Sequence, residues 1–302
     1  MSTSSSSTST PIGLRARRTR RAAAAVGLAA ALGATAACST TDSGETLDEA
    51  TDSGTITVGY AGEAPHSFVD ENGDLTGSAI AIDSAVYEEL GIDTVDGTLV
   101  NFGDLIPGLK AGHFDAVSAN MSILPERCEE VAFSEPTFRY TTALMVPEDN
   151  PMDLTDLDSA KEAGAKVAVM GGAIEGSYTE DLGMDATTVD DAQTGMEAVT
   201  SGRVDAFALT AVSLNWMKKQ QPDAPVEVTE SFVQVIDGVP QEGAGGATFN
   251  KDDTELVEAF NEKLTEITGD KDKFLELTEP FGYTEAEIPD PELTTEILCE
   301  GI

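Results

Sequence analysis

The chain holds few of the side chains that most often carry out chemistry. Its 302 residues include two histidines, three cysteines and one tryptophan. The sequence contains no HExxH, GxSxG, CxxC or phosphate-loop pattern, so it does not indicate the common metalloprotease, serine hydrolase, dithiol or nucleotide sites. Carboxylates are abundant, but in so acidic a chain a pair of them carries little information. We therefore expect no catalytic residue, no metal site and no cofactor.

Basic residues are also scarce. The chain has 17 lysines and arginines against 55 aspartates and glutamates. Five of the arginines lie within residues 15–21, and without them 12 basic and 55 acidic residues leave a formal charge of −43. Such a surface repels nucleic acid and anionic membranes, so we expect no nucleic acid as a partner. An acidic surface also suits concentrated salt, where self-repulsion is screened, although a merely acidic secreted protein would explain it equally well.

No apolar run is long enough to span a bilayer comfortably. The longest, residues 22–37, is built of small residues, follows the basic stretch and ends in Ala-Thr-Ala-Ala before Cys38. This pattern resembles a bacterial lipoprotein signal, in which the cysteine becomes the lipidated first residue; an ordinary secretory signal is the alternative. We expect a signal peptide over residues 1–37 and a flexible tether over residues 38–54. The mature protein is then extracytoplasmic, anchored by lipid at Cys38 to the outer face of the cell membrane.

The remaining cysteines favour a disulfide. If Cys38 carries lipid, Cys128 and Cys299 form an even pair in an oxidising compartment. A bridge between them would close a long loop and so restrict the unfolded chain. Two buried free thiols are the alternative.

Strand and helix signals alternate from residue 55 onward. TITVGYAG reads as a strand, ENGDLTG as a turn and SAIAIDSAVYEELGI as a helix. LIPGLKAGHFDAVSAN and GMEAVTSGRVDAFALT each combine a short amphipathic helix, a glycine and Asp-Ala leading into an apolar strand, with Asp115 matching Asp205. This repeat favours two α/β lobes of related build, although chance similarity between two ordinary turns is the alternative. The predicted fold class is α/β, with mixed, mostly parallel sheets flanked by helices.

The order of these features resembles the family-3 (type II) extracellular solute-binding proteins of ABC importers, which include binders of polar amino acids. The resemblance covers roughly residue 55 to the end and rests on ITVGYAGEAPHSFVDENGDLTG, AGHFDAVSANMSILPERCEEVAFSEP, SGRVDA and EPFGYT. Within the family the chain is most similar to the branch that binds ectoine and hydroxyectoine, through LIPGLKAG, the cysteine of ERC, GGAIEGS and the cysteine of TEILC.

The resemblance implies a two-lobed, periplasmic-binding-protein-like fold. Residues 55–145 plus 246–302 would form lobe 1, and residues 146–245 would form lobe 2. Two chain crossings, near Val146 and Gly243, would make a two-stranded hinge.

One arginine carries most of the chemical argument. Pro125 suits the first turn of a short helix, so Arg127 would sit beside free backbone donors at a helix start, and both features favour an anion. A guanidinium can also grip a carboxylate with two parallel hydrogen bonds. The resemblance assigns Arg127 this role, and a surface ion pair with a neighbouring glutamate is the alternative.

Further carboxylate contacts follow from the resemblance on both lobes. Ser122 matches a ligand-holding position at a strand end, and Asn120 lies on the same face if the strand continues. Polar capping of the strand end is the alternative for both residues. On lobe 2, Gly172, Ala173 and Ile174 match a turn whose backbone N–H groups meet the same carboxylate, and glycine there permits close approach.

The cationic end of the ligand needs an acceptor. Amino-acid binders of the family carry an aspartate on lobe 2 where this chain has the uncharged Thr210, which argues against a standard α-amino acid. Glu63 matches a glutamate that meets the delocalised cation in the ectoine-binding branch; a solvated surface glutamate is the alternative. Phe102 matches one of the aromatic faces that enclose the ligand there, although core packing would explain it too. His66 stands where a phenylalanine is expected, and Ser122 replaces a second one.

The predicted function is that of a solute-binding lipoprotein of an ABC importer. We expect a monomer that captures a small zwitterionic solute, ectoine or hydroxyectoine foremost, and presents it to permease subunits in the membrane. A ligand that touches both lobes favours closure, because only the closed state makes both sets of contacts. The alternatives are a polar amino-acid-binding protein of an importer, a dehydratase on the same fold, and a sensor that serves no importer.

Overall fold

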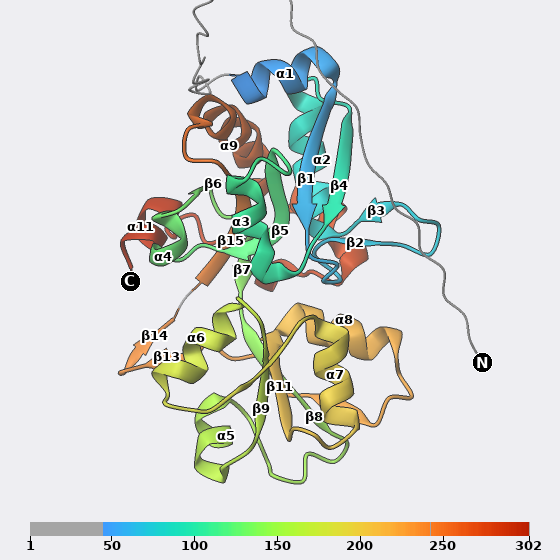
Figure 1. Ribbon diagram of the computed structural model, residues 1–302, viewed down its shortest axis with the longest axis vertical. Helices are drawn as coiled ribbons and strands as arrows, with labels where there is room; N and C mark the ends of the chain where they lie inside the picture. Colours follow the sequence, from blue (N-terminus) through green and yellow to red (C-terminus); the bar gives the residue numbers. More distant parts are fainter. Residues whose placement is uncertain (1–44, 242, 302) are drawn as a thin grey trace, which may run out of the picture. The chain divides into compact units, whose positions relative to one another are not determined.

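The structure is a computed structural model that describes residues 45–241 and 243–301. The predicted signal peptide over residues 1–37 and the predicted lipidation site, Cys38, lie outside these residues. The described chain builds two large β-sheets, each flanked by helices (Figure 1). This arrangement confirms the predicted two-lobed α/β fold. In the described part of the chain, no helix is both long enough and apolar enough to cross a membrane.

Lobe 1 is the part built on the first sheet, residues 45–140 and 243–301. Its strand order is β4-β1-β5-β15-β6, with β7 also paired to β15. The strands are β1 (Thr55–Tyr60), β4 (Thr94–Leu99), β5 (Ala116–Ser122), β6 (Ala132–Phe133), β7 (Phe138–Tyr140) and β15 (Gly243–Phe249), with a hairpin of β2 (Phe68–Val69) and β3 (Leu75–Thr76). The helices are α1 (Glu45–Ser53), α2 (Ser78–Glu89), α3 (Leu105–Lys110), α4 (Pro125–Cys128), α9 (Thr254–Thr268), α10 (Lys271–Thr278), α11 (Thr295–Glu300) and the 3₁₀ helices η1 (Phe102–Asp104), η2 (Glu279–Phe281) and η3 (Glu285–Glu287).

Lobe 2 is the part built on the second sheet, residues 142–241. Its strand order is β10-β9-β11-β8-β12. The strands are β8 (Thr142–Pro147), β9 (Val167–Met170), β10 (Thr187–Val189), β11 (Ala206–Thr210) and β12 (Val226–Val228), with a hairpin of β13 (Val235–Ile236) and β14 (Val239–Pro240). The helices are α5 (Leu157–Ala163), α6 (Ile174–Asp181), α7 (Ala192–Thr200) and α8 (Ala211–Gln220).

Both large sheets are mixed. β1 pairs in parallel with β4 and β5, and β9 pairs in parallel with β10 and β11. Every antiparallel pair of the two large sheets includes β15 or β8. These are the strands next to the two chain crossings, so the hinge strands run against the direction of the repeated helix–strand units.

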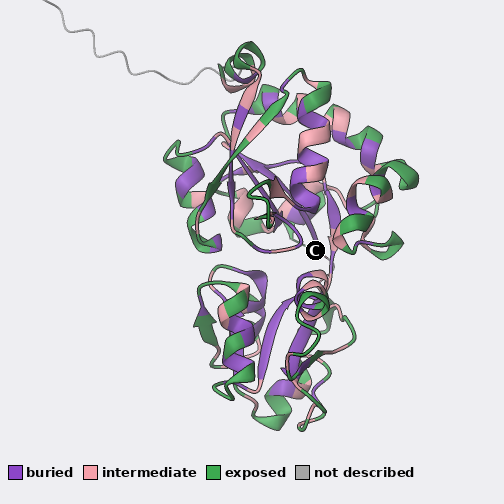
Figure 2. Ribbon diagram, turned by 90° about the vertical axis from the view of Figure 1, so that its right-hand side faces the viewer, coloured by how far each residue is buried: buried purple, intermediate pink, exposed green. Residues whose placement is uncertain are grey.

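The central strands are buried on both faces. All residues of β5 and β9 are buried. In β8, Ala143 and Met145 pack into one apolar cluster, whereas Leu144 and Val146 pack into the other. Figure 2 shows the central strands of both sheets largely buried and the helices exposed along their outer sides. Burial on both faces explains why β8 and β9 are nearly continuous apolar runs, whereas β5 buries the polar Ser118, Asn120 and Ser122.

The chain crosses from the first sheet to the second earlier than predicted, whereas its return lies where it was predicted. It leaves the first sheet after Tyr140 and enters the second at Thr142, rather than near Val146. It returns near Gly243, as predicted, in β15, whose Gly243 pairs with Tyr140; lobe 1 therefore resumes three residues before the predicted boundary at residue 246. An apolar strand fits either sheet, and its sequence does not say which one it joins.

The predicted flexible tether is wrong over residues 45–53, which form α1. Glu45 and Asp48 lie in its first turn, where acidic side chains stabilise a helix. Ala50 is buried, and the Thr46 hydroxyl donates to Asp253 Oδ1 at 2.7 Å. The segment is polar overall, but Leu47 also packs against the apolar core of lobe 1. The single apolar face of α1 is therefore enough to pack this segment against lobe 1.

The internal repeat has a structural counterpart. Asp115 Oδ2 accepts the backbone N–H of Thr57 at 2.8 Å, and Asp205 Oδ2 accepts the backbone N–H of Lys166 at the same distance. Each aspartate precedes a central strand, β5 or β11, and bonds to the chain beside the start of a parallel neighbour, β1 or β9. The matched aspartates therefore perform the same task in the two lobes.

Cys128 and Cys299 form a disulfide, as predicted, with Cα atoms 5.6 Å apart. Cys128 ends α4 and Cys299 lies in α11, and the two helices are in contact. The bridge fastens the end of the described chain to the short helix that carries Arg127 (Figure 1).

Candidate functional site

The candidate site is a cavity between the lobes, lined by residues of both. Its volume of about 20 Å³ is room for about one water molecule, so the lobes are closed upon each other. Many of the lining residues stand at or just after the carboxyl ends of β1, β5, β9 and β11, which is where α/β sheets place their ligands. The lining consists of Glu63, His66, Phe102, Ala119, Asn120, Ser122, Tyr140, Met170, Ala173, Ile174, Glu175, Leu209 and Thr210. It includes every predicted ligand-binding residue except Arg127 and Gly172.

Glu63 is a buried carboxyl at the boundary of the lobes. It is 7 % exposed, and the hydroxyl of Ser213 on lobe 2 donates to its Oε1 at 2.6 Å. Burial raises the pKa of Glu63 to about 7, the Ser213 hydrogen bond lowers it, and the charge of Glu175 raises it. The alternative of a solvated surface glutamate is therefore wrong. Ser213, which sequence reasoning missed, shows that closure supplies part of the surroundings of Glu63.

His66 lies beside Glu63 as a neutral imidazole. Burial lowers the pKa of His66 to about 3. Its Nδ1 is 2.6 Å from the Tyr283 hydroxyl and 3.1 Å from Nδ2 of Asn120. Because an amide nitrogen can only donate, Nδ1 accepts, and the ring proton resides on Nε2, 3.8 Å from Glu63 Oε1. His66 therefore carries no charge of its own and leaves Glu63 without a positive partner.

Asn120 lines the cavity, but the hydrogen-bond partners of its side-chain amide all lie in lobe 1. Besides His66, its Nδ2 lies within hydrogen-bond distance of Ser78 Oγ at 3.2 Å and of the Tyr283 hydroxyl at 3.1 Å, so its two protons are shared among three acceptors, and its Oδ1 accepts from Thr137 Oγ1. Its backbone is left-handed, with φ of 47°, which asparagine tolerates better than most residues. The side chain organises the wall behind Glu63, whereas the sequence assigned it to the ligand.

Arg127 bridges the lobes through main-chain carbonyls. Its Nη1 donates to the Ser122 carbonyl at 2.8 Å, and its Nη2 donates to the Gly172 carbonyl at 2.7 Å. The guanidinium also lies 5.6 Å from the ring centroid of Phe102, in a cation–π arrangement. In this closed state Phe102 therefore faces the protein's own cation, and Gly172 presents its carbonyl where the sequence led us to expect its N–H.

The backbones of the two lobes also approach each other at facing glycines. An alanine Cβ at Gly172 would lie 3.0 Å from Gly103 Cα, and one at Gly103 would lie 3.4 Å from the Gly171 carbonyl oxygen. Gly172 also has φ of +80°, which favours glycine. The residue is thus required both for its backbone shape and for the approach of the lobes. The neighbouring N–H of Ala173 already donates to the Met170 carbonyl at 3.1 Å, which satisfies this predicted ligand donor within lobe 2.

Glu175 is the main site residue that the sequence did not reveal. It is fully buried in the first turn of α6, and its Oε1 accepts a hydrogen bond from the Tyr140 hydroxyl. Burial raises the pKa of Glu175, while the Tyr140 hydrogen bond lowers it. Thr210, which lines the same wall before α8, also bonds to Tyr140. Only the position of Glu175 directly after Ile174 in GGAIEGS could have drawn attention to it.

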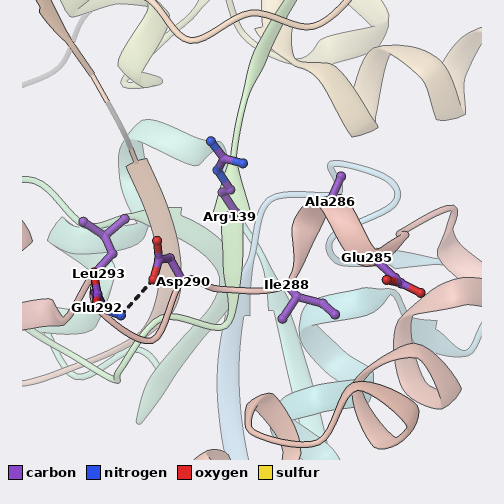
Figure 3. Close-up of a pocket in the computed structure, with 7 residues that line it drawn as sticks. All are labelled: Arg139, Glu285, Ala286, Ile288, Asp290, Glu292 and Leu293. Atoms are coloured by element: carbon purple, nitrogen blue, oxygen red, sulfur yellow. Dashed lines mark hydrogen bonds between the residues drawn. The ribbon is translucent and has the colours of Figure 1, made fainter.

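A larger hollow of about 670 Å³ lies beside β7 and the C-terminal segment. Figure 3 shows its side chains pointing in different directions rather than converging on one point. The only hydrogen bond drawn among them is local, from the Glu292 N–H to Asp290 Oδ1 at 2.9 Å. The cavity that contains Glu63 is therefore the better candidate. Residues 45–241 and 243–301 contain no group of three or more side chains suited to hold a metal ion.

Comparison with known sequences gives consistent matches. The profile of the bacterial extracellular solute-binding proteins, family 3, matches residues 56–278. A probable amino-acid ABC transporter periplasmic-binding protein of Sinorhizobium fredii is 35% identical over 263 residues, 85% of this chain and 86% of that protein. The lysine/arginine/ornithine-binding periplasmic protein of Escherichia coli is 28% identical over 211 residues, 68% of this chain and 79% of that protein.

Solved structures agree with the sequence matches. A crystal structure of EhuB in complex with hydroxyectoine superposes with a TM-score of 0.76 at 29% identity, covering 86% of this chain and 100% of that chain. An ancestral arginine-binding protein bound to arginine superposes with a TM-score of 0.66 at 30% identity, covering 76% of this chain and 98% of that chain. Both likenesses extend far enough to include both lobes.

Proposed function

The chain belongs to the bacterial extracellular solute-binding proteins, family 3, and on that premise we propose that it captures a small carboxylated cation between its lobes. The family consists of extracellular solute-binding proteins, and the Sinorhizobium fredii relative is named as a probable amino-acid ABC transporter protein. The protein accordingly works outside the cytoplasm and delivers its solute to the permease subunits of such an importer. The closed form, in which both lobes contact the solute, is the form presented to the permease.

One observation carries the cationic half of this proposal, the burial of Glu63 in the cavity between the lobes. A buried carboxyl is costly to ionise unless a positive partner accompanies it. His66 is neutral and Ser213 offers only a hydroxyl, so neither supplies that charge. A cationic solute would, and its arrival would allow Glu63 to ionise.

Arg127 supports the other half of the proposal, the binding of the solute's carboxylate. Its guanidinium reaches carbonyls of both lobes in the closed state, at Ser122 and Gly172. These are neutral acceptors, and a solute carboxylate would form stronger, charge-assisted bonds with the same fork of donors. Because the cavity holds about one water molecule, the lobes must part to admit a solute, and parting them breaks the bond to Gly172.

Ectoine or hydroxyectoine is the solute that we propose first. Its support is the likeness to EhuB in complex with hydroxyectoine, together with Glu63 and Phe102 in the cavity and an uncharged Thr210 on lobe 2. A polar amino acid is the second candidate, and the relatives that bind lysine, arginine and ornithine favour it.

A calorimetric screen with ectoine, hydroxyectoine, glycine betaine and the common amino acids tests the proposal. Arg127→Ala should abolish binding of every carboxylated ligand, and Glu63→Gln should weaken the cationic ones strongly. The matched controls are Arg203→Ala and Glu71→Gln, which change exposed residues of the same types. Micromolar affinity retained by Arg127→Ala, with the fold intact by circular dichroism, would refute the carboxylate clamp.

We also propose lipid anchoring at Cys38, from the small residues that precede it. Labelling of the expressed protein with a fatty acid should be lost in Cys38→Ser. Equal labelling of the two proteins would exclude this anchor.

A further inference from the structure

A second carboxyl group faces the same cavity from the opposite lobe. Glu175 projects from α6 of lobe 2, whereas Glu63 belongs to lobe 1. Both residues line the cavity and both are buried. The negative charge of Glu175 acts on Glu63, so the two groups are close enough to interact. The cavity is therefore acidic on two sides.

The two oxygens of Glu175 differ in their partners. Oε1 accepts from the Tyr140 hydroxyl, whereas Oε2 is buried and has no hydrogen-bond partner within the described part of the chain. An unpartnered buried carboxylate oxygen costs free energy that most folds avoid. Because this oxygen lies in the wall of a ligand cavity, a bound ligand could donate the missing hydrogen bond.

We infer that Glu175 is a second acceptor for the ligand's cation, so that one carboxylate from each lobe holds the cation on closure. The inference rests on the proposed function and deepens it. It requires a cation that offers N–H groups in at least two directions, one toward Glu63 and one toward Glu175. Amidinium and guanidinium groups meet this requirement, whereas a quaternary ammonium has no N–H to offer Oε2.

Within that class, the charge balance of the cavity favours a solute of net charge +1. Glu63 and Glu175 face one guanidinium, that of Arg127, whose charge acts on Glu175. His66 is uncharged, and burial raises the pKa of Tyr140, Tyr178 and Tyr283, which keeps these phenols neutral. With both carboxyls ionised, the site has one negative charge in excess. A zwitterion has no net charge, so the excess negative charge remains unless one carboxyl keeps its proton. A solute of net charge +1 neutralises the excess charge.

The variant Glu175→Gln tests the inference, with arginine, ectoine and glycine betaine as the probes. Loss of a charge-assisted hydrogen bond should weaken the amidinium or guanidinium ligand by about 10- to 100-fold. Glu180→Gln, an exposed glutamate of the same helix, is the matched control and should leave the affinity unchanged. The affinity for glycine betaine should fall less than that for arginine or ectoine, because its quaternary ammonium makes no hydrogen bond to Oε2.

The outcomes separate this inference from the proposed function. If Glu63→Gln and Arg127→Ala weaken binding but Glu175→Gln does not, the second acceptor is refuted and the binding function stands. If none of the three changes affinity, the proposed function itself fails. A protein that binds glycine betaine more tightly than arginine and ectoine would also overturn the inference.

A measurement on the unaltered protein covers the case in which Glu175→Gln does not fold. A bound net cation should hold both carboxyls ionised, whereas a zwitterion leaves one of them protonated, so arginine binding at pH 6 should release more protons than ectoine binding. Calorimetry in two buffers with different ionisation enthalpies counts these protons. Equal counts for the two ligands would contradict a cation held by both carboxylates.

Discussion

Replacing Gly172 by alanine tests how closely the lobes approach. The new Cβ would lie 3.0 Å from Gly103 Cα, across the boundary between lobes. Overpacking of this kind typically costs about 1–3 kcal/mol. The cost falls only on the closed state, because the open state separates the two glycines. Ligand affinity should therefore drop by roughly 5- to 100-fold, at about 1.4 kcal/mol for each factor of ten.

The same substitution carries a second cost, which a control removes. Gly172 has φ of +80°, and an alanine there loses about 1–2 kcal/mol in folding stability. Gly183 has φ of +68°, and an alanine Cβ there would meet open space, so Gly183→Ala carries the backbone cost alone. Both variants should lose similar free energy of unfolding in urea, whereas only Gly172→Ala should lose affinity.

The single tryptophan provides the optical assay. Trp216 belongs to α8 of lobe 2, and its ring centroid lies 6.0 Å from that of Phe68 and 6.5 Å from that of Phe281, both in lobe 1. Ligand titrations followed by its emission should therefore report closure. Equal losses of affinity in the alanine variants of Gly172 and Gly183, or none in either, would refute the closed contact at Gly103.

Two further predictions concern stability. The Cys128–Cys299 bridge spans 171 residues, so the double serine variant should lose about 5 kcal/mol of unfolding free energy by the loop-entropy relation, and a loss below about 1 kcal/mol would contradict that account. Burial raises the pKa of Asp83 from 3.8 to about 7, although the Ser118 hydroxyl donates to it. The folded state then binds the proton more tightly than the unfolded state, so this contribution to stability is lost as pH rises from about 4 to about 7. In denaturant titrations, Asp83→Asn should remove up to roughly 4 kcal/mol of the unfolding free energy that the wild type loses between pH 4 and pH 8. The exposed Asp96→Asn should keep the wild-type loss. Parallel pH profiles of unfolding free energy for the wild type and Asp83→Asn would exclude the mechanism.

The fold was predictable where local signals agree. The helix over residues 78–89 and the strand from Thr55 follow from periodicity and glycine stops, and the matched Asp115 and Asp205 indicated two related units. The failures have one cause in common. The docking of α1 and the crossing at Thr141 depend on which surface a segment meets, and a weak apolar face or an all-apolar strand does not encode its partner.

The site was predictable only in part. The resemblance placed Glu63 and Phe102 near a ligand, and both lie in the cavity wall. Glu175 was hidden because one buried carboxylate looks like any other among 55 acidic residues. The bond from Arg127 to the Gly172 carbonyl could not be foreseen either, since it forms only when the lobes meet. Contacts between lobes are set by closure rather than by local sequence.

The disulfide also has a topological consequence. Cys128 precedes the first strand of lobe 2 and Cys299 follows its last, so lobe 2 lies wholly inside a covalent ring. A protease that cuts one peptide bond there would open the ring without releasing a fragment. After a single cleavage within lobe 2, the chain on each side of the cut thus remains covalently joined to the rest of the molecule.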